Sequence, residues 1–157
     1  LMLTQENPPF DFYDPRHPIY THSRFLPSSR IDGCHIERVV VADGCRIYNA
    51  SVERCVIGLR SMVRPGARLR DVVMMGADFY ETEEQRAENR RLGRPPVGIG
   101  HNTSIERAII DKNARIGRDV VIRSHKGEVD HHEELYSVRD GIVVIPKNTV
   151  IRDGTII

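Results

Sequence analysis

The sequence predicts an all-β fold in which short parallel strands wind into a β-helix, and three observations lead to this prediction. Aliphatic residues recur at steps of five and six residues along most of the chain. The pattern returns after 16 residues, since Ile31 is followed by Ile47 and Ile36 by Val52. A motif of one aliphatic residue, two charged residues, a variable residue and two mostly aliphatic residues also recurs. Its five copies are IERVVV at 36–41, VERCVI at 52–57, LRDVVM at 69–74, IERAII at 105–110 and IRDGTI at 151–156.

The step length separates this fold from a helix and from a simple sheet. One face of an α-helix repeats at three and four residues, and a half-buried strand repeats at two. Steps of five and six are typical of a solenoid built from hexapeptide-like rungs. Three short strands then make one coil, and coils stack by parallel pairing about 4.8 Å apart. We therefore expect a column of inward aliphatic side chains, with the five motif copies on one side of successive coils.

The expected inward positions form three blocks that divide the chain. They are Ile31, Ile36, Val41, Ile47, Val52, Ile57, Val63, Leu69 and Met74, then Ile99, Ile105, Ile110, Ile116 and Ile122, then Ile145, Ile151 and Ile156. We assign residues 28–157 to this β-helix and residues 1–27 to a linker and lead-in. The chain starts with Leu1 and soon reaches a proline pair, which is typical of a linker joined in mid-protein.

Two segments interrupt the periodicity. Within residues 75–98, Thr82 and Gln85 match a capping box, and Gly93 follows a basic pair. This pattern predicts a short, exposed helix with few apolar residues. Residues 124–141 contain a His pair among acidic residues, and we expect them to form an inserted loop that leaves the coil.

The composition argues against several classes of protein. The net charge of the 157 residues is +1, so no general basic field favours nucleic acid or an anionic membrane. Aromatic residues are scarce, with 4 Phe, 5 Tyr and no Trp, which disfavours base stacking. Neither an apolar run of about 20 residues nor a signal peptide is found. The three cysteines, Cys34, Cys45 and Cys55, fit no disulfide or zinc pattern, so a reducing cytoplasm or plastid stroma fits best.

A pair of Lys-Asn dipeptides is the most specific candidate site. Lys112 and Lys147 each follow an inward isoleucine at the same offset, 35 residues apart. Without the 18 residues of 124–141, 17 residues remain, which is one coil. The two lysines should therefore lie on neighbouring coils, with backbones about 5 Å apart. Their repulsion is about 1 kcal/mol at 4 Å in water, and an anion between them reverses its sign.

Two interpretations of the lysine pair remain open on this evidence. One is a phosphate or other anion site, to which Arg115 adds a third positive charge and which Asp111 partly neutralises. The other is a solvated ladder of charged side chains.

Catalytic and metal sites find less support in the sequence. A hexapeptide-repeat acyltransferase uses one histidine as a general base, and a β-helical metalloenzyme uses several as zinc ligands. His101, His131 and His132 are the histidines that we considered, but no HxxxH or similar ligand spacing occurs. Neither a glycine-rich nucleotide loop nor a nucleophile elbow is found. We therefore expect no catalytic residue and no metal ligand in this chain.

Several longer strings resemble those of one enzyme family, in the same order along the chain. They are PIYT at 18–21, RFLP at 24–27, MMGADFYET at 74–82, GIG at 98–100, IDKNARIG at 110–117, GIVVIPKN at 141–148 and DGTII at 153–157. From about Phe12 to Ile157, the chain resembles the C-terminal domain of the ADP-glucose pyrophosphorylase (glucose-1-phosphate adenylyltransferase) family, in its cyanobacterial and plant branch.

The resemblance implies a fold, an activity and a regulatory role. It implies a left-handed parallel β-helix within an enzyme that makes ADP-glucose and pyrophosphate from ATP and glucose 1-phosphate, with magnesium, for glycogen or starch biosynthesis. Such enzymes are tetramers, activated by 3-phosphoglycerate and inhibited by phosphate in this branch. Two lysines of the family's regulatory site match Lys112 and Lys147, and Asp111 and Arg115 are included because they are adjacent.

The chain departs from the family because the catalytic domain and its ATP, sugar-phosphate and magnesium ligands are absent from it. We therefore expect an allosteric and oligomerisation domain that holds no cofactor and is inactive alone. Its expected partners are the catalytic domain of the same protein, further subunits of a homo- or hetero-oligomer, and phosphorylated effectors, but not nucleic acid or a membrane. The alternatives are a free-standing hexapeptide-repeat acyltransferase or metalloenzyme, and a purely structural β-helix.

Overall fold

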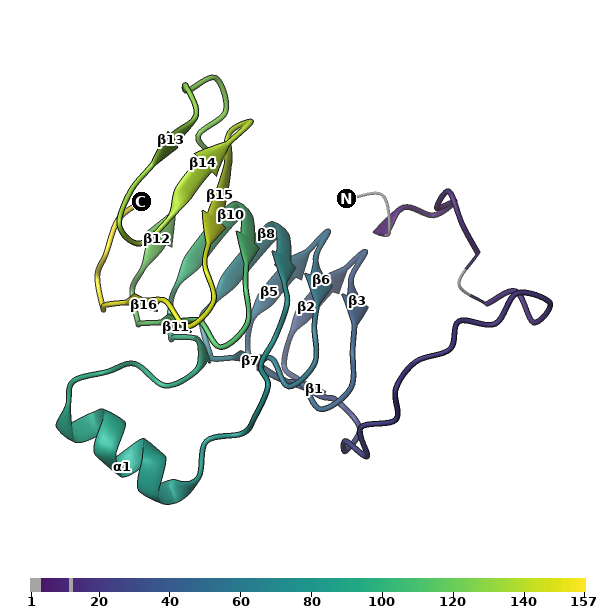
Figure 1. Cartoon of the computed structure of the whole chain (residues 1–157), viewed down its shortest axis with the longest axis horizontal. Coiled ribbons are helices and arrows are strands. Elements are labelled where there is room, and N and C mark those ends of the chain that lie inside the picture. The colour runs from purple at the N-terminus through teal and green to yellow at the C-terminus, as the bar shows by residue number, and fades with distance from the viewer. Residues whose placement is uncertain (1–3, 12) are drawn as a thin grey trace.

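The structure is a computed structural model that describes residues 4–11 and 13–157. Its main body is a column of stacked coils of short strands, with the N-terminal segment extending away at one end (Figure 1). Helix α1 (Glu83–Arg91) stands beside the column, and a hairpin with strand β13 (His131–His132) lies towards the opposite end.

One side of the column is a six-stranded parallel sheet. Its strands, in spatial order, are β1 (Arg30–Asp32), β4 (Arg46–Tyr48), β7 (Met62–Val63), β9 (Gly98–Ile99), β11 (Arg115–Ile116) and β16 (Val150–Ile151). Ile31 lies opposite Ile47, which confirms the 16-residue period. Ile47 in turn lies opposite Val63.

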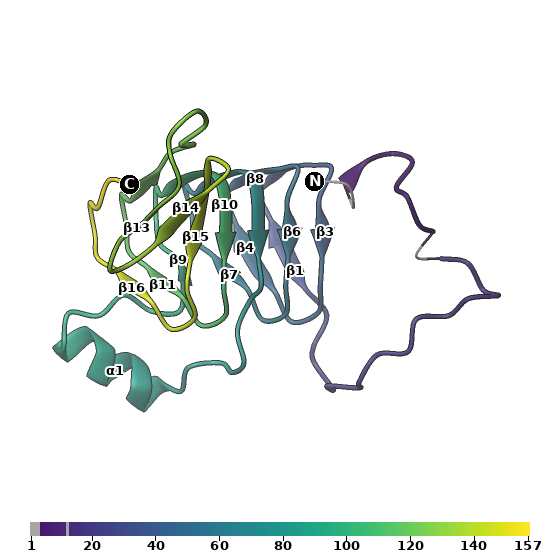
Figure 2. The ribbon, with the colours of Figure 1, turned by 45° about the horizontal axis from the view of Figure 1, so that its top comes forward.

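The remaining sides form a ten-stranded sheet, in which the two longest strands lie side by side (Figure 2). Its main path is β13, β14 (Ser137–Arg139), β15 (Ile142–Ile145), β10 (Ser104–Ile110), β8 (Arg68–Met74), β5 (Ser51–Glu53) and β2 (His35–Glu37). Strands β3 (Val40–Val41), β6 (Val56–Ile57) and β12 (Val121–Ile122) join it from the side.

The core is the predicted column of aliphatic side chains. The largest fully buried residues are Ile47, Ile57, Leu69, Ile99, Ile105, Ile110, Ile116, Ile122, Ile145, Ile151, Val52 and Val63. All twelve are positions that the periodicity predicted to face inward. Burying each such side chain stabilises the fold by about 1.5–3 kcal/mol, so the column supplies the main favourable term.

The first coil is an exception, because only one neighbouring coil covers it. Ile31 is 44% exposed and Ile36 is 37% exposed, although each lies in register with a fully buried residue of the next coil. The end of the column nearest the N-terminal segment is therefore an open apolar surface.

The prediction for the last coil is wrong in two respects. The copy at 151–156 does not share a side with the other four, because Ile151 pairs with Ile116 in the six-stranded sheet. Ile156 lies opposite Val121 and is 68% exposed, while Ile157 packs against the core. The step from Ile151 to the next inward residue is therefore six, as it is from Ile116 to Ile122 in the coil below.

Helix α1 confirms the predicted capping signals. The Thr82 hydroxyl accepts a hydrogen bond from the Gln85 amide, and the Gln85 side chain accepts one from the Thr82 amide. Gly93, with φ of +62°, follows the last turn, where a left-handed residue satisfies free carbonyl groups. Within the part of the chain that the structure describes, no helix has both the length and the apolar character that crossing a bilayer requires.

The second interruption is more ordered than the predicted loop. β13 pairs antiparallel with β14, and β14 pairs antiparallel with β15, so a hairpin extends the ten-stranded sheet. The prediction that residues 124–141 leave the coil is confirmed, but their strand pairing was missed.

Candidate anion-binding site

The two Lys-Asn dipeptides lie at the same corner of neighbouring coils, as predicted. Ile110 and Ile145, which precede them, are paired across β10 and β15. The Asn148 amide donates a hydrogen bond to the Lys112 carbonyl oxygen at 3.0 Å. The hairpin therefore leaves the coil and returns without changing the register of this corner.

The asparagines of both dipeptides have a conformational role. Asn113 and Asn148 have φ of +61° and +62°, a left-handed conformation that asparagine tolerates better than most residues. Asn113 is also buried, and its side-chain nitrogen donates to the Asn148 side-chain oxygen at 3.1 Å. The left-handed backbone at the corner thus explains why asparagine occupies both positions, whereas the backbone conformation does not require lysine before it.

The lysine ammonium groups converge on one carboxylate, that of Asp78. Lys112 Nζ lies 3.1 Å from Asp78 Oδ1, and Lys147 Nζ lies 2.8 Å from Asp78 Oδ2. Asn113 completes the contact, because its Oδ1 accepts the Asp78 amide at 2.8 Å and its Nδ2 donates to Asp78 Oδ2 at 3.1 Å. The corner is therefore a site that already holds one anionic group.

The charged side chains of this cluster shift one another's pKa values. Hydrogen bonds from Lys147, Lys112 and Asn113 hold the pKa of Asp78 well below its usual range. The hydrogen bond to Asp78 raises the pKa of Lys147, and the charges of Asp78 and Asp111 add to this shift. Because the three charged side chains are about half exposed, solvent screens each contact.

The other two predicted residues lie beside the lysines in different roles. Asp111 Oδ1 accepts the amide of Lys112 at 2.6 Å, so this carboxylate fixes the start of the corner. Arg115 Nη1 lies 2.7 Å from Glu81 Oε1 and donates to the Pro95 carbonyl oxygen at 2.9 Å. The charge of Arg115 is thus balanced by Glu81 in this structure.

Glu81 anchors the connection that carries Asp78. Its side chain is only 6% exposed, and that of Arg115 is 16% exposed. The two Glu81 oxygens also accept hydrogen bonds from the Asn89 side chain at 2.8 Å and the Val97 amide at 3.1 Å. One carboxylate thus ties α1 and both ends of the first interruption to the coil.

A cavity of about 640 Å³ lies next to this anchor, between the first interruption and the six-stranded sheet. Its lining is rich in arginine, with Arg46, Arg60, Arg64, Arg86, Arg90, Arg94 and Arg118. Glu81 and Asp153 are the acidic residues of this lining, so positive charge dominates. Burial lowers the pKa of Arg64, whose guanidinium donates to the carbonyl oxygens of Val97 and Ile99.

Sequence reasoning missed Asp78, Glu81 and the second role of Asn113. The two acidic residues lie in the first interruption, where no periodicity relates them to a coil position. Their presence in the MMGADFYET string was the available signal, but the string alone assigns no contact to them.

Comparison with known proteins identifies a matching family model and a similar curated protein. The model of the GLGC left-handed parallel β-helix domain matches residues 24–156. Over 159 aligned residues, the chain is 50% identical to the chloroplastic/amyloplastic large subunit 1 of glucose-1-phosphate adenylyltransferase from Zea mays. The alignment covers 100% of this chain but 31% of the maize protein, so the chain spans about a third of that relative.

Proposed function

Because the chain belongs to the family of GLGC left-handed parallel β-helix domains, we propose that it is the regulatory and oligomerisation part of a glucose-1-phosphate adenylyltransferase. Its 50% identity to the maize large subunit supports this assignment. Adenylyl transfer from ATP to glucose 1-phosphate, with magnesium, would belong to the remaining part of such an enzyme. This chain would contribute the binding of a phosphorylated effector.

The observation that carries the proposal is the convergence of Lys112 and Lys147 on Asp78. Two ammonium groups from neighbouring coils form a geometry that holds a small oxyanion. A phosphate group offers more charge and more acceptor oxygens than one carboxylate. We infer that a phosphorylated effector, of the 3-phosphoglycerate or inorganic phosphate type, takes the position of the Asp78 carboxylate.

This exchange would couple effector binding to the first interruption. Asp78 is three residues from Glu81, and between them Tyr80 donates its hydroxyl to the Gly44 carbonyl oxygen at 2.8 Å. Release of Asp78 from the lysines would change the restraints on this segment. An effector that binds the released arrangement better would shift the population towards it, which is the thermodynamic requirement for regulation.

Phosphate binding to single variants tests the site. We expect Lys112→Gln and Lys147→Gln to weaken binding of inorganic phosphate and 3-phosphoglycerate, measured by calorimetry at low ionic strength. Lys126→Gln is the matched control, since Lys126 is an exposed lysine of the hairpin. Equal affinities in all three variants would refute the lysine site.

The role of Asp78 makes a prediction of opposite sign. Asp78→Asn removes the internal competitor while keeping its size, so phosphate should bind several-fold more tightly. Weaker binding in this variant would mean that Asp78 takes part in holding the ligand.

We propose further subunits as the protein partners, because the maize relative is named as a large subunit. The name of that relative also places it in chloroplasts and amyloplasts, so we propose a plastid stroma or a cytoplasm for this chain. The roles of Asp111 and Arg115 in effector binding stay predictions. A chain that assembles but ignores phosphate would favour the purely structural alternative, and acetyl transfer from acyl-CoA would favour the acyltransferase.

A further inference from the structure

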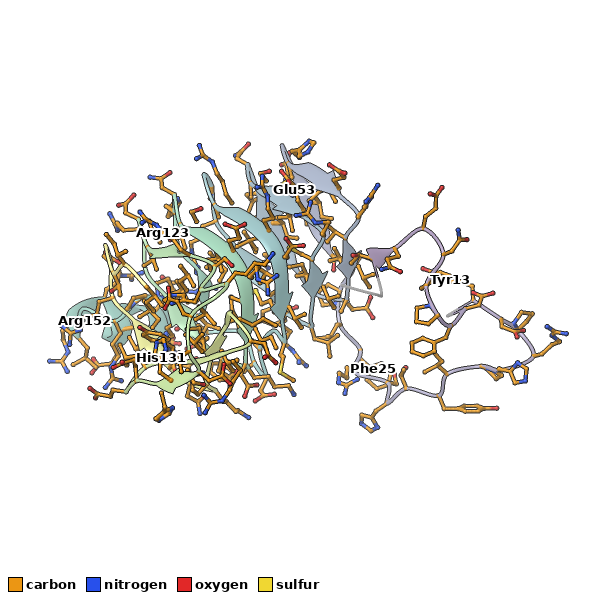
Figure 3. All side chains as sticks on the ribbon, turned by 90° about the horizontal axis from the view of Figure 1, so that it is seen from above. Tyr13, Phe25, Glu53, Arg123, His131 and Arg152 are labelled. Carbon is orange, nitrogen blue, oxygen red and sulfur yellow. The ribbon has the colours of Figure 1, made fainter. Side chains whose placement is uncertain are left out.

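Three side chains of the hairpin segment converge in a way that the regulatory role does not use. His125 and Glu128 precede β13, and His131 begins it. One potential ligand atom from each residue lies within 4.8 Å of the other two. Figure 3 shows His131 far from Tyr13 of the N-terminal segment, so this cluster lies away from the open end of the column.

We propose that His125, Glu128 and His131 bind a divalent metal ion of the zinc type. Two imidazoles and one carboxylate are a donor set that zinc accepts, with a water molecule in the fourth position of a tetrahedron. Imidazole donors favour zinc and its neighbours in the transition series over magnesium and calcium, which prefer sets made of oxygen.

The hydrogen bonding of His131 prepares one ring nitrogen for a metal. His131 Nδ1 lies 3.0 Å from the Val129 carbonyl oxygen. A carbonyl oxygen can only accept, so the neutral ring carries its proton on Nδ1 and leaves the lone pair on Nε2. Metal-binding histidines are commonly oriented by this kind of hydrogen bond from the second ring nitrogen.

His125 and Glu128 supply the other two donors from one turn. His125 Nδ1 lies 2.8 Å from Glu128 Oε2, and the Glu128 amide donates to the His125 carbonyl oxygen at 3.0 Å. A metal that enters here would take both donors and replace their mutual hydrogen bond. The His125 side chain is 15% exposed and that of Glu128 is 56% exposed, so the metal would be reached from the carboxylate side.

The surroundings hold the two imidazoles near each other. The Tyr136 ring packs against both, with ring centroids 6.3 Å from His125 and 6.1 Å from His131. The His125 amide donates to the Gly141 carbonyl oxygen, and His131 lies opposite Val138 in the hairpin. His125 and His131, the first and last residues of the ligand set, are thus both held by backbone contacts to the segment from β14 to β15.

The local charge favours a cation. Residues 125–134 contain four carboxylates and one lysine. Arg139, the nearest arginine in the hairpin, directs its guanidinium to the carbonyl oxygens of His131 and Val138. A divalent ion in this segment would therefore offset an excess of negative charge.

The sequence predicts no metal ligand, because it contains no HxxxH-like spacing. The ligands here follow a spacing of three and three residues, H-x-x-E-x-x-H. A helix would not bring such a set to one point, since residues six apart lie on different faces. The turn at 125–128 and the start of the hairpin bring them together, so only the tertiary structure reveals the site.

Zinc titration of the 157-residue chain tests this inference. We expect one Zn²⁺ per chain by calorimetry, and Co²⁺ should give the intense visible bands of a tetrahedral site. His131→Ala and Glu128→Gln should each weaken binding at least about tenfold. His132→Ala is the matched control, because His132 is the next residue and an exposed histidine outside the cluster, and its affinity should equal that of the unmodified chain.

Further measurements test the metal site even if His131→Ala folds poorly. Glu128→Gln changes an exposed side chain, and circular dichroism without metal should match that of the unmodified chain. NMR signals of the His125 and His131 side chains should shift with Zn²⁺ but not with Mg²⁺. No binding by the unmodified chain, or an equal loss in His132→Ala, would overturn the site.

Discussion

The two interruptions of the column solve the same problem in different ways. Each leaves the coil at one corner and must return to the next coil without disturbing the register. Residues 75–98 do so largely through side chains, because Glu81 and Asp78 bond to side chains of the coil, and their helix stands off the column. Residues 124–141 do so through backbone pairing, because β13 and β14 extend the sheet that contains β15.

The candidate sites arise at these two interruptions. The periodic coils contribute aliphatic side chains inward and charged side chains outward. The first interruption brings Asp78 to the lysines of two coils, and the second brings His125 to Glu128 and His131. In both cases a segment without periodicity supplies residues of the candidate site.

Shortening Ile110 should have the largest effect, because it affects both interruptions. This fully buried residue pairs with Met74, after which the first interruption begins, and with Ile145 of β15, the strand that follows the second interruption. We expect Ile110→Ala to lower the free energy of unfolding by about 4 kcal/mol. Urea unfolding measures the loss, and Ile31→Ala at the open end should cost clearly less, since Ile31 is half exposed. Equal losses would mean that the column is not the shared support.

Removing the Glu81 carboxylate should destabilise the first interruption and leave the second unaffected. Glu81→Ala leaves Arg115 without its carboxylate and removes the contacts to Asn89 and Val97, so we expect a cost of about 3 kcal/mol. Hydrogen exchange should rise in α1 and leave the hairpin amides unchanged. Glu133→Ala, in the exposed part of the hairpin, is the control. Faster exchange throughout the hairpin would show that the two segments are coupled.

The smallest expected effect is the pH dependence that Asp78 contributes. The pKa of Asp78 is lowered in the folded chain, so its contribution to stability is complete above the usual aspartate pKa of about 4. It is lost as pH falls from there towards the lowered pKa. Urea unfolding between pH 5 and pH 2.5 should therefore show a weaker acid dependence in Asp78→Asn than in the unmodified chain. Identical pH profiles would mean that the lysine contacts contribute nothing in solution.

The repeating part of this protein could be predicted from its sequence. The 16-residue recurrence gave the register of Ile31 with Ile47, the capping box gave the start of α1, and the equal offsets placed Lys112 beside Lys147. These features are local or periodic, so each coil repeats the same short-range preferences. The left-handed fold, implied by resemblance, agrees with the family model that matches residues 24–156. Periodicity gave no handedness, because both hands share one spacing.

The paths by which the non-periodic segments return to the coils could not be predicted from the sequence. The tertiary structure placed Asp78 between the lysines and Glu81 against Arg115, and it turned the expected loop at 124–141 into a hairpin. It also moved the last inward residue from Ile156 to Ile157. The physical reason is the same in each case. A contact between a long connection and a distant coil depends on the path of the whole connection, and no repeat in the sequence records that path.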